Sequence, residues 1–429
     1  MQVRQEPLRQ ELGQLLPPIS SAVRRLSPGS ASTCRFSDSE MAVNNGEVCM
    51  GMAGSIQRRA VYVLVSGLMA WGVVWALSAC SPGTPIAVGY IGGLSGKFAD
   101  LGTASRNGAL LAIEQTNDAG GVRGRKLHLV EVDDRQNNEA ALQAMEELVR
   151  QQVVAVIGPS TSSVAMAVTP YANDHQLVLV SPTGTTSKLT GKDDYFFRAV
   201  GEASFYGAHA ARFYAEKFKV RSAALILDMA NADYTESWGD AFAAEFQRVG
   251  GKVSVFERFK STENPNHADI ARKLLASKPD MVVTVASSVD AALIAQRVRG
   301  LNPTVRLVGA SWASTERLIE LGGSAVEGML FEQYFDRFDT SPKYQAFAQA
   351  YRERFKAEPG YAALLAFDSA RMVVAALQKT DQRQEIKPAL LQIRNFDGVQ
   401  DPVRIDDFGD VQRRVHYGEV RNGHFAPLH

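Results

Sequence analysis

The sequence predicts an α/β fold with two similar lobes, each built around a mostly parallel sheet. From Pro85 onward, short runs rich in β-branched residues alternate with longer amphipathic stretches, and this alternation is typical of βαβ units. The same alternation starts again near Ala223. Removing residues 1–79 from the 429 leaves 350, which is more than one hydrophobic core usually serves. Two lobes are therefore expected.

The first run of alternation extends from the strand at Ile86 to the loop after Val180. Its first helix has an apolar face around Ile113, and Gly120–Gly121 supplies the glycine that commonly follows a helix C-terminus. Strands are predicted at residues 86–91, 127–132, 153–157 and 177–180, and a second helix at 139–150.

The second run repeats this order and ends in a helical region. Strands are predicted at residues 223–227, 253–256, 281–285 and 306–308, with helices at 235–249, 268–277 and 290–299. After Phe331, helices are predicted at 344–355, 362–378 and 388–393, followed by a final strand pair at 403–405 and 415–420.

Composition and motifs argue against several classes of function. Lys and Arg total 46 and Asp and Glu total 46, without a long basic run, so a nucleic-acid partner is not expected. The seven histidines show no His-x-x-x-His spacing, so we predict neither a metal site nor a cofactor. The pairs Asp133–Asp134 and Asp406–Asp407 could bind a metal or act in acid/base chemistry, but they fit strand ends and turns better. With no nucleophile and base pair evident, the chain is predicted not to be an enzyme.

Two clusters of small hydroxyl residues suggest binding instead. Ser160–Ser163 follows the strand that ends at Ile157, and Ser181–Thr185 begins where the strand ending at Val180 stops. Open α/β sheets bind ligands at the carboxyl ends of their strands. We expect each cluster to open toward a helix N-terminus, which attracts an anion such as a carboxylate. Any one of these hydroxyls could be a simple N-cap, but the two clusters together favour a binding site.

Several motifs carry a resemblance to a known family. They are Asn117-Asp118-Ala119-Gly120-Gly121-Val122-Arg123-Gly124-Arg125-Lys126-Leu127, Asp133-Asp134, Ala155-Val156-Ile157-Gly158-Pro159, Tyr195-Phe196-Phe197-Arg198, Ala366-Phe367-Asp368 and Asp407-Phe408-Gly409-Asp410. Over residues 85–420 the chain resembles the leucine/isoleucine/valine-binding family of type I periplasmic solute-binding proteins. The resemblance implies two Rossmann-like lobes with parallel sheets joined by three hinge crossovers. It also implies a ligand held between the lobes and delivery to the permease of an ABC importer.

The family's order of elements also implies the lobe boundaries in this chain. The crossovers fall near 202–204, 333–335 and 415–417. The N-terminal lobe is then 85–203 plus 335–415, and the C-terminal lobe is 204–334 plus 416–429. Closure of the lobes over a ligand would be a hinge motion.

One part of the family's pocket is matched by this sequence. The residues that correspond to its two carboxylate-holding loops are Thr161, Ser162, Thr183, Gly184 and Thr185. Tyr234 matches the tyrosine that lines the far lobe.

The other part of the pocket departs from the family. Ser311, beside Trp312, stands where amino-acid-binding members carry an acidic residue for the ligand's ammonium. Ser287 and Leu101 each replace a tyrosine. Burying an ammonium without an anionic partner costs several kcal/mol. An ordinary α-amino acid is therefore a poor fit for the pocket.

The chain still contains acids that could restore recognition of an ammonium. An α-amino acid would be accommodated if Asp290, Glu316 or Asp228 reached the pocket.

An export signal is predicted before the lobes. Arg58 and Arg59 precede an uncharged hydrophobic stretch at 60–76, which ends in Leu77-Ser78-Ala79-Cys80. This order resembles the lipobox of bacterial lipoproteins, so residues 52–79 are predicted to be a signal peptide and Cys80 the lipidated residue. An ordinary transmembrane helix is the alternative. Residues 1–51 are predicted to be a non-native or disordered extension, with translation starting near Met52.

These observations lead to one predicted function and two alternatives. The chain is expected to be a monomeric, lipid-anchored receptor of an ABC importer, exported to the periplasmic face of a membrane. That membrane would be the outer one in a Gram-negative host. Its ligand would be a small organic acid, amide or amino-acid-like molecule. The alternatives are a sensor of the same fold that signals to a membrane receptor, and an exported enzyme.

Overall fold

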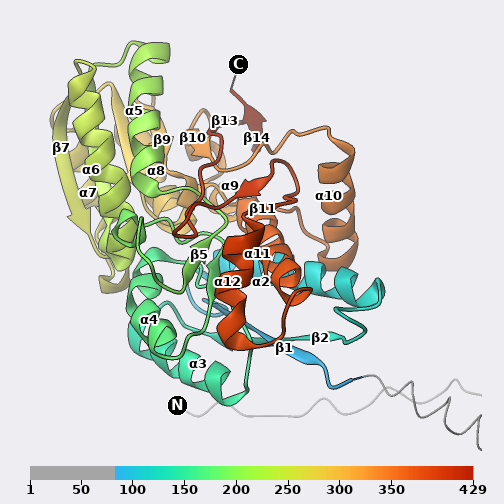
Figure 1. The fold of residues 1–429 in the computed structure, drawn as a ribbon. Helices are drawn as coiled ribbons and strands as arrows, with labels where there is room; N and C mark the ends of the chain where they lie inside the picture. The colour runs from blue at the N-terminus through green and yellow to red at the C-terminus, as the bar shows by residue number, and fades with distance from the viewer. Residues whose placement is uncertain (1–82, 429) are drawn as a thin grey trace, which may run out of the picture. The chain divides into compact units, whose positions relative to one another are not determined.

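The computed structural model describes residues 83–428 (Figure 1). The predicted extension, the predicted signal peptide and Cys80 lie outside the described residues. Residues 83–428 fold around two separate sheets, with three hydrophobic clusters packed against them. This is the α/β fold with two parallel-sheet lobes that the sequence predicts.

The first lobe has a parallel sheet of five strands in the order β2-β1-β3-β4-β5. The strands are β1 (Ile86–Gly92), β2 (Leu127–Asp133), β3 (Val156–Ile157), β4 (Leu179–Ser181) and β5 (Phe196–Arg198). The helices that connect them are α2 (Ala99–Asp118), α3 (Asn138–Arg150) and α4 (Ser162–Asp174). Asn137 caps α3 by accepting hydrogen bonds from the backbone N–H groups of Glu139 and Ala140.

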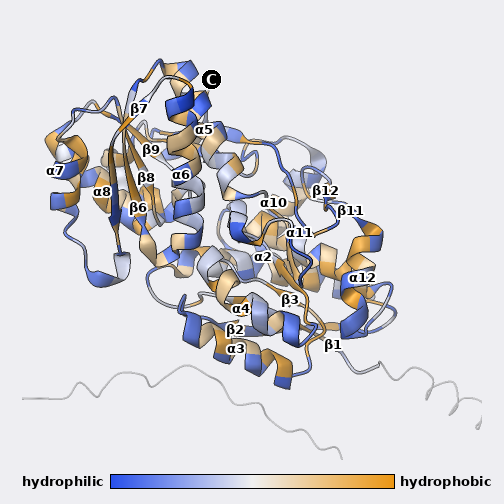
Figure 2. Ribbon diagram, turned by 60° about the vertical axis from the view of Figure 1, so that its left-hand side comes forward, coloured by the Kyte–Doolittle hydropathy of each residue, from blue (hydrophilic) through white to orange (hydrophobic). Residues whose placement is uncertain are grey.

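The second lobe has a sheet of seven strands in the order β14-β13-β10-β9-β8-β6-β7. Five strands are parallel, namely β6 (Ser222–Asp228), β7 (Lys252–Phe259), β8 (Met281–Val285), β9 (Arg306–Gly309) and β10 (Leu330–Gln333). The antiparallel edge consists of β13 (His416–Arg421) and β14 (His424–Pro427). Strand β8 is buried along its whole length and is hydrophobic in Figure 2, as expected for a strand covered on both faces.

Helices cover the second sheet on both faces. They are α5 (Ala203–Phe218), α6 (Ala232–Arg248), α7 (His267–Leu275), α8 (Ser288–Leu301) and α9 (Glu316–Gly322). Helices α5 and α6 pack on each other and form one layer, whereas α7, α8 and α9 form the other. Figure 2 shows α7 and α8 on one side of β6 and β8, and α5 and α6 on the other.

The chain then returns to the first lobe. Helices α10 (Pro342–Phe355) and α12 (Arg383–Ile393) flank α11 (Tyr361–Leu377), which is buried along most of its length and packs against α2, β3 and β4. The segments between β5 and α5, between β10 and α10, and before β13 therefore cross between the lobes. The exact lobe boundaries stay a prediction.

Two expectations about secondary structure are wrong. The strands at 403–405 and 415–420 do not pair with each other. Strand β12 (Val403–Arg404) pairs with β11 (Asn395–Phe396), while β13 joins the seven-stranded sheet. The second hydroxyl cluster does not lead into a regular α-helix, because only the short 3-10 helix Ser187–Leu189 follows it. In both places, the structure of a short segment depends on tertiary contacts that local sequence patterns do not specify.

Candidate ligand-binding site

A small cavity lies between the lobes, where strands of both sheets end. Eight residues line it: Leu101, Ser160, Thr183, Asn231, Tyr234, Trp312, Tyr334 and Tyr361. The first lobe contributes α2, α11 and the loops after β3 and β4, and the second contributes the segments after β6, β9 and β10. The carboxyl ends of parallel strands are where open α/β sheets bind ligands, so this cavity is the candidate site.

The first lobe presents hydroxyl groups to the cavity. The Ser160 hydroxyl is buried and has no hydrogen-bond partner among the described residues. The Tyr90 hydroxyl lies beside it but donates its proton to the Gly102 carbonyl at 2.7 Å. The Thr183 hydroxyl donates to the Ser160 carbonyl at 2.5 Å, which ties the two loops together. Ser160 therefore offers an unused buried donor to a ligand.

The opposite side of the cavity is an aromatic wall, built by the second lobe, by the segment after β10 and by Tyr361 of α11 in the first lobe. Trp312 lies edge-to-face with Tyr234, with ring centroids 6.0 Å apart, and it also contacts Phe98 of the first lobe at 5.6 Å. Tyr334 and Tyr361 form another edge-to-face pair, with centroids 5.5 Å apart. Such pairs fix the orientation of the rings and leave apolar faces and edges around the cavity.

A buried acid lies directly behind this wall. Oε1 of Glu332 accepts hydrogen bonds from the Ser311 N–H at 2.9 Å, the Ser311 hydroxyl at 2.5 Å and the Trp238 indole N–H at 3.0 Å. Oε2 has no partner among residues 83–428, and the whole side chain is buried. Burial raises the pKa of Glu332 to about 7.

The structure brings four of the predicted site residues to the cavity, namely Leu101, Thr183, Tyr234 and Trp312. It does not bring Ser287 or Ser311 there. Ser287 caps α8 and donates to Asp290 at 2.9 Å, and Ser311 donates to Glu332 as described above.

The remaining predicted residues lie behind the first lobe's loops. Thr161 is the N-cap residue of α4, and Ser162 accepts hydrogen bonds from the backbone N–H groups of Thr185 and Thr186 at 3.0 and 3.1 Å. The Gly184 N–H donates to the Ser181 hydroxyl at 2.8 Å. These groups shape the two loops and do not line the cavity.

None of the three candidate acids lines the cavity either. Asp290 binds Lys97 at 2.7 Å and His267 at 3.0 Å. Glu316 forms an ion pair with Arg337, and Asp228 accepts backbone hydrogen bonds after β6.

Direct hydrogen bonds join the two lobes around the cavity. Oδ2 of Asp100 accepts from the Ser288 hydroxyl at 2.8 Å and from the Thr315 hydroxyl at 2.7 Å. On the other side, Asp233 accepts from the Ser163 hydroxyl at 2.9 Å and pairs with Lys188 at 2.7 Å. Together with the Lys97–Asp290 pair, these contacts hold the lobes closed over the cavity.

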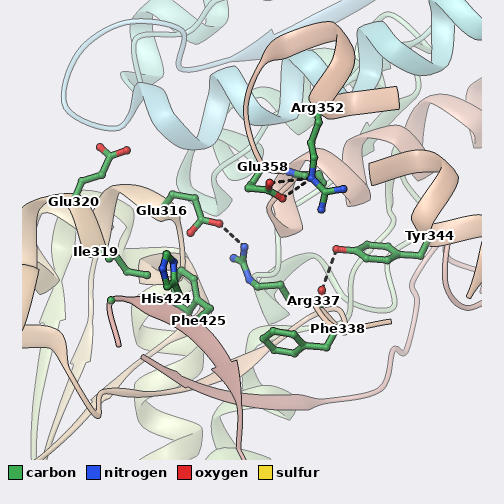
Figure 3. Close-up of a pocket in the computed structure, with 12 residues that line it drawn as sticks. Glu316, Ile319, Glu320, Arg337, Phe338, Tyr344, Arg352, Glu358, His424 and Phe425 are labelled. Atoms are coloured by element: carbon green, nitrogen blue, oxygen red, sulfur yellow. Dashed lines mark hydrogen bonds and ion pairs between the residues drawn. The ribbon is translucent and has the colours of Figure 1, made fainter. Parts of the chain in front are cut away.

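A wider groove lies on the outside of the molecule, next to α9, α10 and β14 (Figure 3). Its charged side chains mostly bind one another, since Arg337 pairs with Glu316 and Arg352 pairs with Glu358. Tyr344 donates to the Arg337 carbonyl at 3.3 Å. Most of the charged groups that line the groove are therefore already paired with one another.

The sequence indicates Ser160 as a member of the Ser160–Ser163 cluster, but it did not lead to four other residues of this site: Asn231, Tyr334, Tyr361 and Glu332. Asn231 had a signal, because it lies three residues before Tyr234. Glu332 had a signal too, because it is a charged residue inside the apolar strand β10. Tyr361 had none, because it reaches the cavity only through the packing of α11 on the first lobe.

Searches of the described part of the chain give two further results. Residues 83–428 contain no group of three or more His, Cys, Asp or Glu side chains arranged to hold a metal ion. Within the same range, no helix combines the length and the apolarity needed to cross a membrane.

Comparisons with known proteins place this site in a family context. The leucine-, isoleucine-, valine-, threonine- and alanine-binding protein of Pseudomonas aeruginosa is 26% identical over 76% of this chain and 87% of its own length. The isoleucine complex of the branched-chain amino acid transporter substrate-binding protein LivJ from Streptococcus pneumoniae is 26% identical. It matches with a TM-score of 0.74 over 80% of this chain and 97% of that chain.

A third structure shares the fold with a different ligand. The solute-binding protein of an ABC transporter from R. palustris, solved with benzoate, is 20% identical. Its TM-score is 0.71 over 80% of this chain and 95% of that chain.

The family model described as "Periplasmic binding protein" matches residues 85–424, which is most of the chain and includes every residue of the cavity. Its members bind solutes and are not enzymes. The chain therefore belongs to the periplasmic binding protein family, within the leucine/isoleucine/valine-binding group of ABC transporter substrate-binding proteins.

Proposed function

We propose that this protein is the lipid-anchored, extracytoplasmic receptor of an ABC importer, and that it captures a small carboxylate, amide or amino-acid-like ligand between its lobes. The observation that carries this proposal is the cavity itself, with an unpartnered hydroxyl on one side and aromatic rings on the other. The cavity is small in this closed form. A compact ligand is therefore favoured.

The relatives support ligands of this size and kind. The names of the P. aeruginosa and S. pneumoniae proteins refer to amino acids, and the R. palustris structure contains benzoate. The interlobe hydrogen bonds of Asp100 and Asp233 support capture by hinge closure. A ligand that contacts both lobes would shift the equilibrium toward this closed form.

Ser160 provides the test of the site. We expect mature protein purified under native conditions to carry a small polar ligand, detectable by mass spectrometry, and calorimetry to measure its affinity. Ser160→Ala should weaken binding by about 1–3 kcal/mol, the usual cost of losing a hydrogen bond to a charged group. The control is Ser105→Ala, which removes another buried hydroxyl without a partner that does not line the cavity. Equal affinities in the two variants would rule out the proposed site.

Cys80 provides the test of the anchor. It follows the small residues of the predicted cleavage site, and Ser81 lacks the acidic character of an inner-membrane retention signal. Cys80→Ala should therefore move the protein from the membrane fraction to the soluble fraction. Membrane fractionation of Cys80→Ala identical to that of the parent would contradict lipid anchoring through this residue.

A further inference from the structure

The cavity is closed by residues that carry no charge at neutral pH. Hydroxyl, amide and aromatic groups, with Leu101, make up all of its lining in the described part of the chain. A carboxylate ligand would find donors in the Ser160 hydroxyl and in the tyrosine hydroxyls of the opposite wall. A ligand ammonium would find only neutral oxygens there, because no lining side chain supplies an anionic counter-ion.

Glu332 is the acid that could supply a negative charge for a ligand ammonium, because only Ser311 and the aromatic wall separate it from the cavity. Its Oε1 already accepts three hydrogen bonds, which satisfy that oxygen. Its Oε2 is buried without a partner among the described residues. An ionised carboxylate would leave part of its charge on this dry, unpaired oxygen, whereas a protonated carboxyl would not.

The groups around Glu332 do not provide a compensating positive charge. Tyrosine side chains approach it from α5, α6, α11, β13 and the segment after β10, and they are Tyr206, Tyr214, Tyr234, Tyr334, Tyr361 and Tyr417. The Tyr334 hydroxyl lies near both Ser311 and the Tyr234 hydroxyl. Glu332 thus anchors a chain of hydroxyl groups that ends at the cavity wall.

We propose that the cavity selects a compact monocarboxylate with an apolar or aromatic body and no ammonium group, and that Glu332 is an uncharged positioning residue for Ser311 and Tyr334. This inference rests on the proposed function of the cavity as a ligand site. It departs from the amino-acid ligands for which the P. aeruginosa and S. pneumoniae relatives are named. Removing the amino group from a ligand should therefore strengthen binding to this protein.

Matched pairs of compounds test the ligand class on the unmodified protein. Calorimetry should compare 4-methylpentanoate with leucine, and phenylacetate with phenylglycine. We expect the deaminated acid of each pair to bind at least about tenfold more tightly, because the amino acid must bury an ammonium without a counter-ion. Equal or tighter binding of the amino acids overturns this inference but leaves the proposed function intact. Absence of binding by all four compounds contradicts the small-acid ligand of the proposed function, and this inference with it.

Glu332→Gln tests the role of the buried acid. Glutamine keeps the shape of the protonated side chain and cannot become an anion. We expect the variant to bind the deaminated acids within about threefold of the parent and to keep the parent's preference within each pair. Loss of amino-acid binding in this variant, with the acids unaffected, would instead identify Glu332 as a counter-ion. The comparison of compound pairs on the parent protein decides the ligand class even if the variant does not fold.

Discussion

Glu332 owes its position to the alternation of side chains along β10. Leu330 and Tyr334 belong to the hydrophobic cluster shared with α6, whereas Phe331 belongs to the cluster on the opposite face of the sheet. Glu332 therefore points toward α6, where Trp238 donates a hydrogen bond to it. Glu332, which does not line the cavity, can in this way position Ser311 and Tyr334 beside the cavity.

The raised pKa of Glu332 predicts a pH dependence of stability. The folded protein keeps its proton up to about pH 7, while the unfolded chain releases it near the ordinary value of 4.5. Between these values the folded state binds more protons, so stability falls as pH rises, by at most about 1.4 kcal/mol per pH unit. Urea denaturation at pH 5, 6, 7 and 8 should show a flatter profile for Glu332→Gln. Burial also raises the pKa of Asp134 to about 6, so Asp134 likewise makes stability fall as pH rises. This contribution should remain in Glu332→Gln. Identical profiles for parent and variant would contradict a protonated Glu332.

At the scale of single residues, the sequence predicts part of the lining of the candidate cavity. Thr183 follows a predicted strand, whereas Tyr234 and Trp312 were assigned from the family resemblance. Ser162 was expected to face the ligand, but its oxygen accepts two backbone hydrogen bonds instead. A hydroxyl in such a loop can satisfy either the backbone or a ligand, and only the folded geometry decides which.

At the scale of elements, the start of α2 and the start of α8 meet across the cleft. Lys97 lies just before α2, and its ammonium contacts the Asp290 carboxylate, which is fully buried. Hydrogen bonds from Lys97, His267 and Ser287 outweigh the effect of burial and lower the pKa of Asp290. This ion pair bridges the lobes, so it stabilises the closed form alone.

Lys97→Met should therefore weaken ligand binding by up to about 5-fold, because a partly exposed ion pair contributes up to about 1 kcal/mol to closure. The control is Arg272→Met, which breaks an exposed ion pair to Asp269 within α7 and should leave affinity unchanged. Calorimetry with the copurifying ligand measures both variants. An unchanged affinity for Lys97→Met would show that the pair does not contribute to closure.

The elements themselves were mostly predictable, because βαβ units have strong periodic signals. The strand at Met281–Val285 has the predicted bounds, and α3 begins one residue before its prediction. Strand β5 and helix α5 had no prediction, since β5 is only three residues long and α5 follows it within the crossover region. The strands predicted as a final pair show the limit of local patterns, which do not specify pairing partners.

At the scale of the whole described region, the first and third crossing segments are tied together. Arg413, in the third crossing, donates to the Ala199 carbonyl of the first crossing at 2.6 Å. It also forms a buried ion pair with Asp368 of α11 at 2.6 Å. Such a link holds the two crossings next to each other while the lobes change their separation. The two-lobe architecture was predictable from the repeated alternation, whereas this buried link was not.

Trp312 offers the most direct measurement of binding between the lobes. If the predicted signal is cleaved, Trp238 and Trp312 are the tryptophans that remain, and only Trp312 lines the cavity. The mature protein and its Trp312→Phe and Trp238→Phe variants should be titrated with 4-methylpentanoate and with leucine while tryptophan emission is recorded. We expect a saturable emission change in the parent and in Trp238→Phe. In Trp312→Phe most of that change should vanish and affinity should fall. A full response in Trp312→Phe with its loss in Trp238→Phe would contradict the central claim that the ligand binds in this cavity.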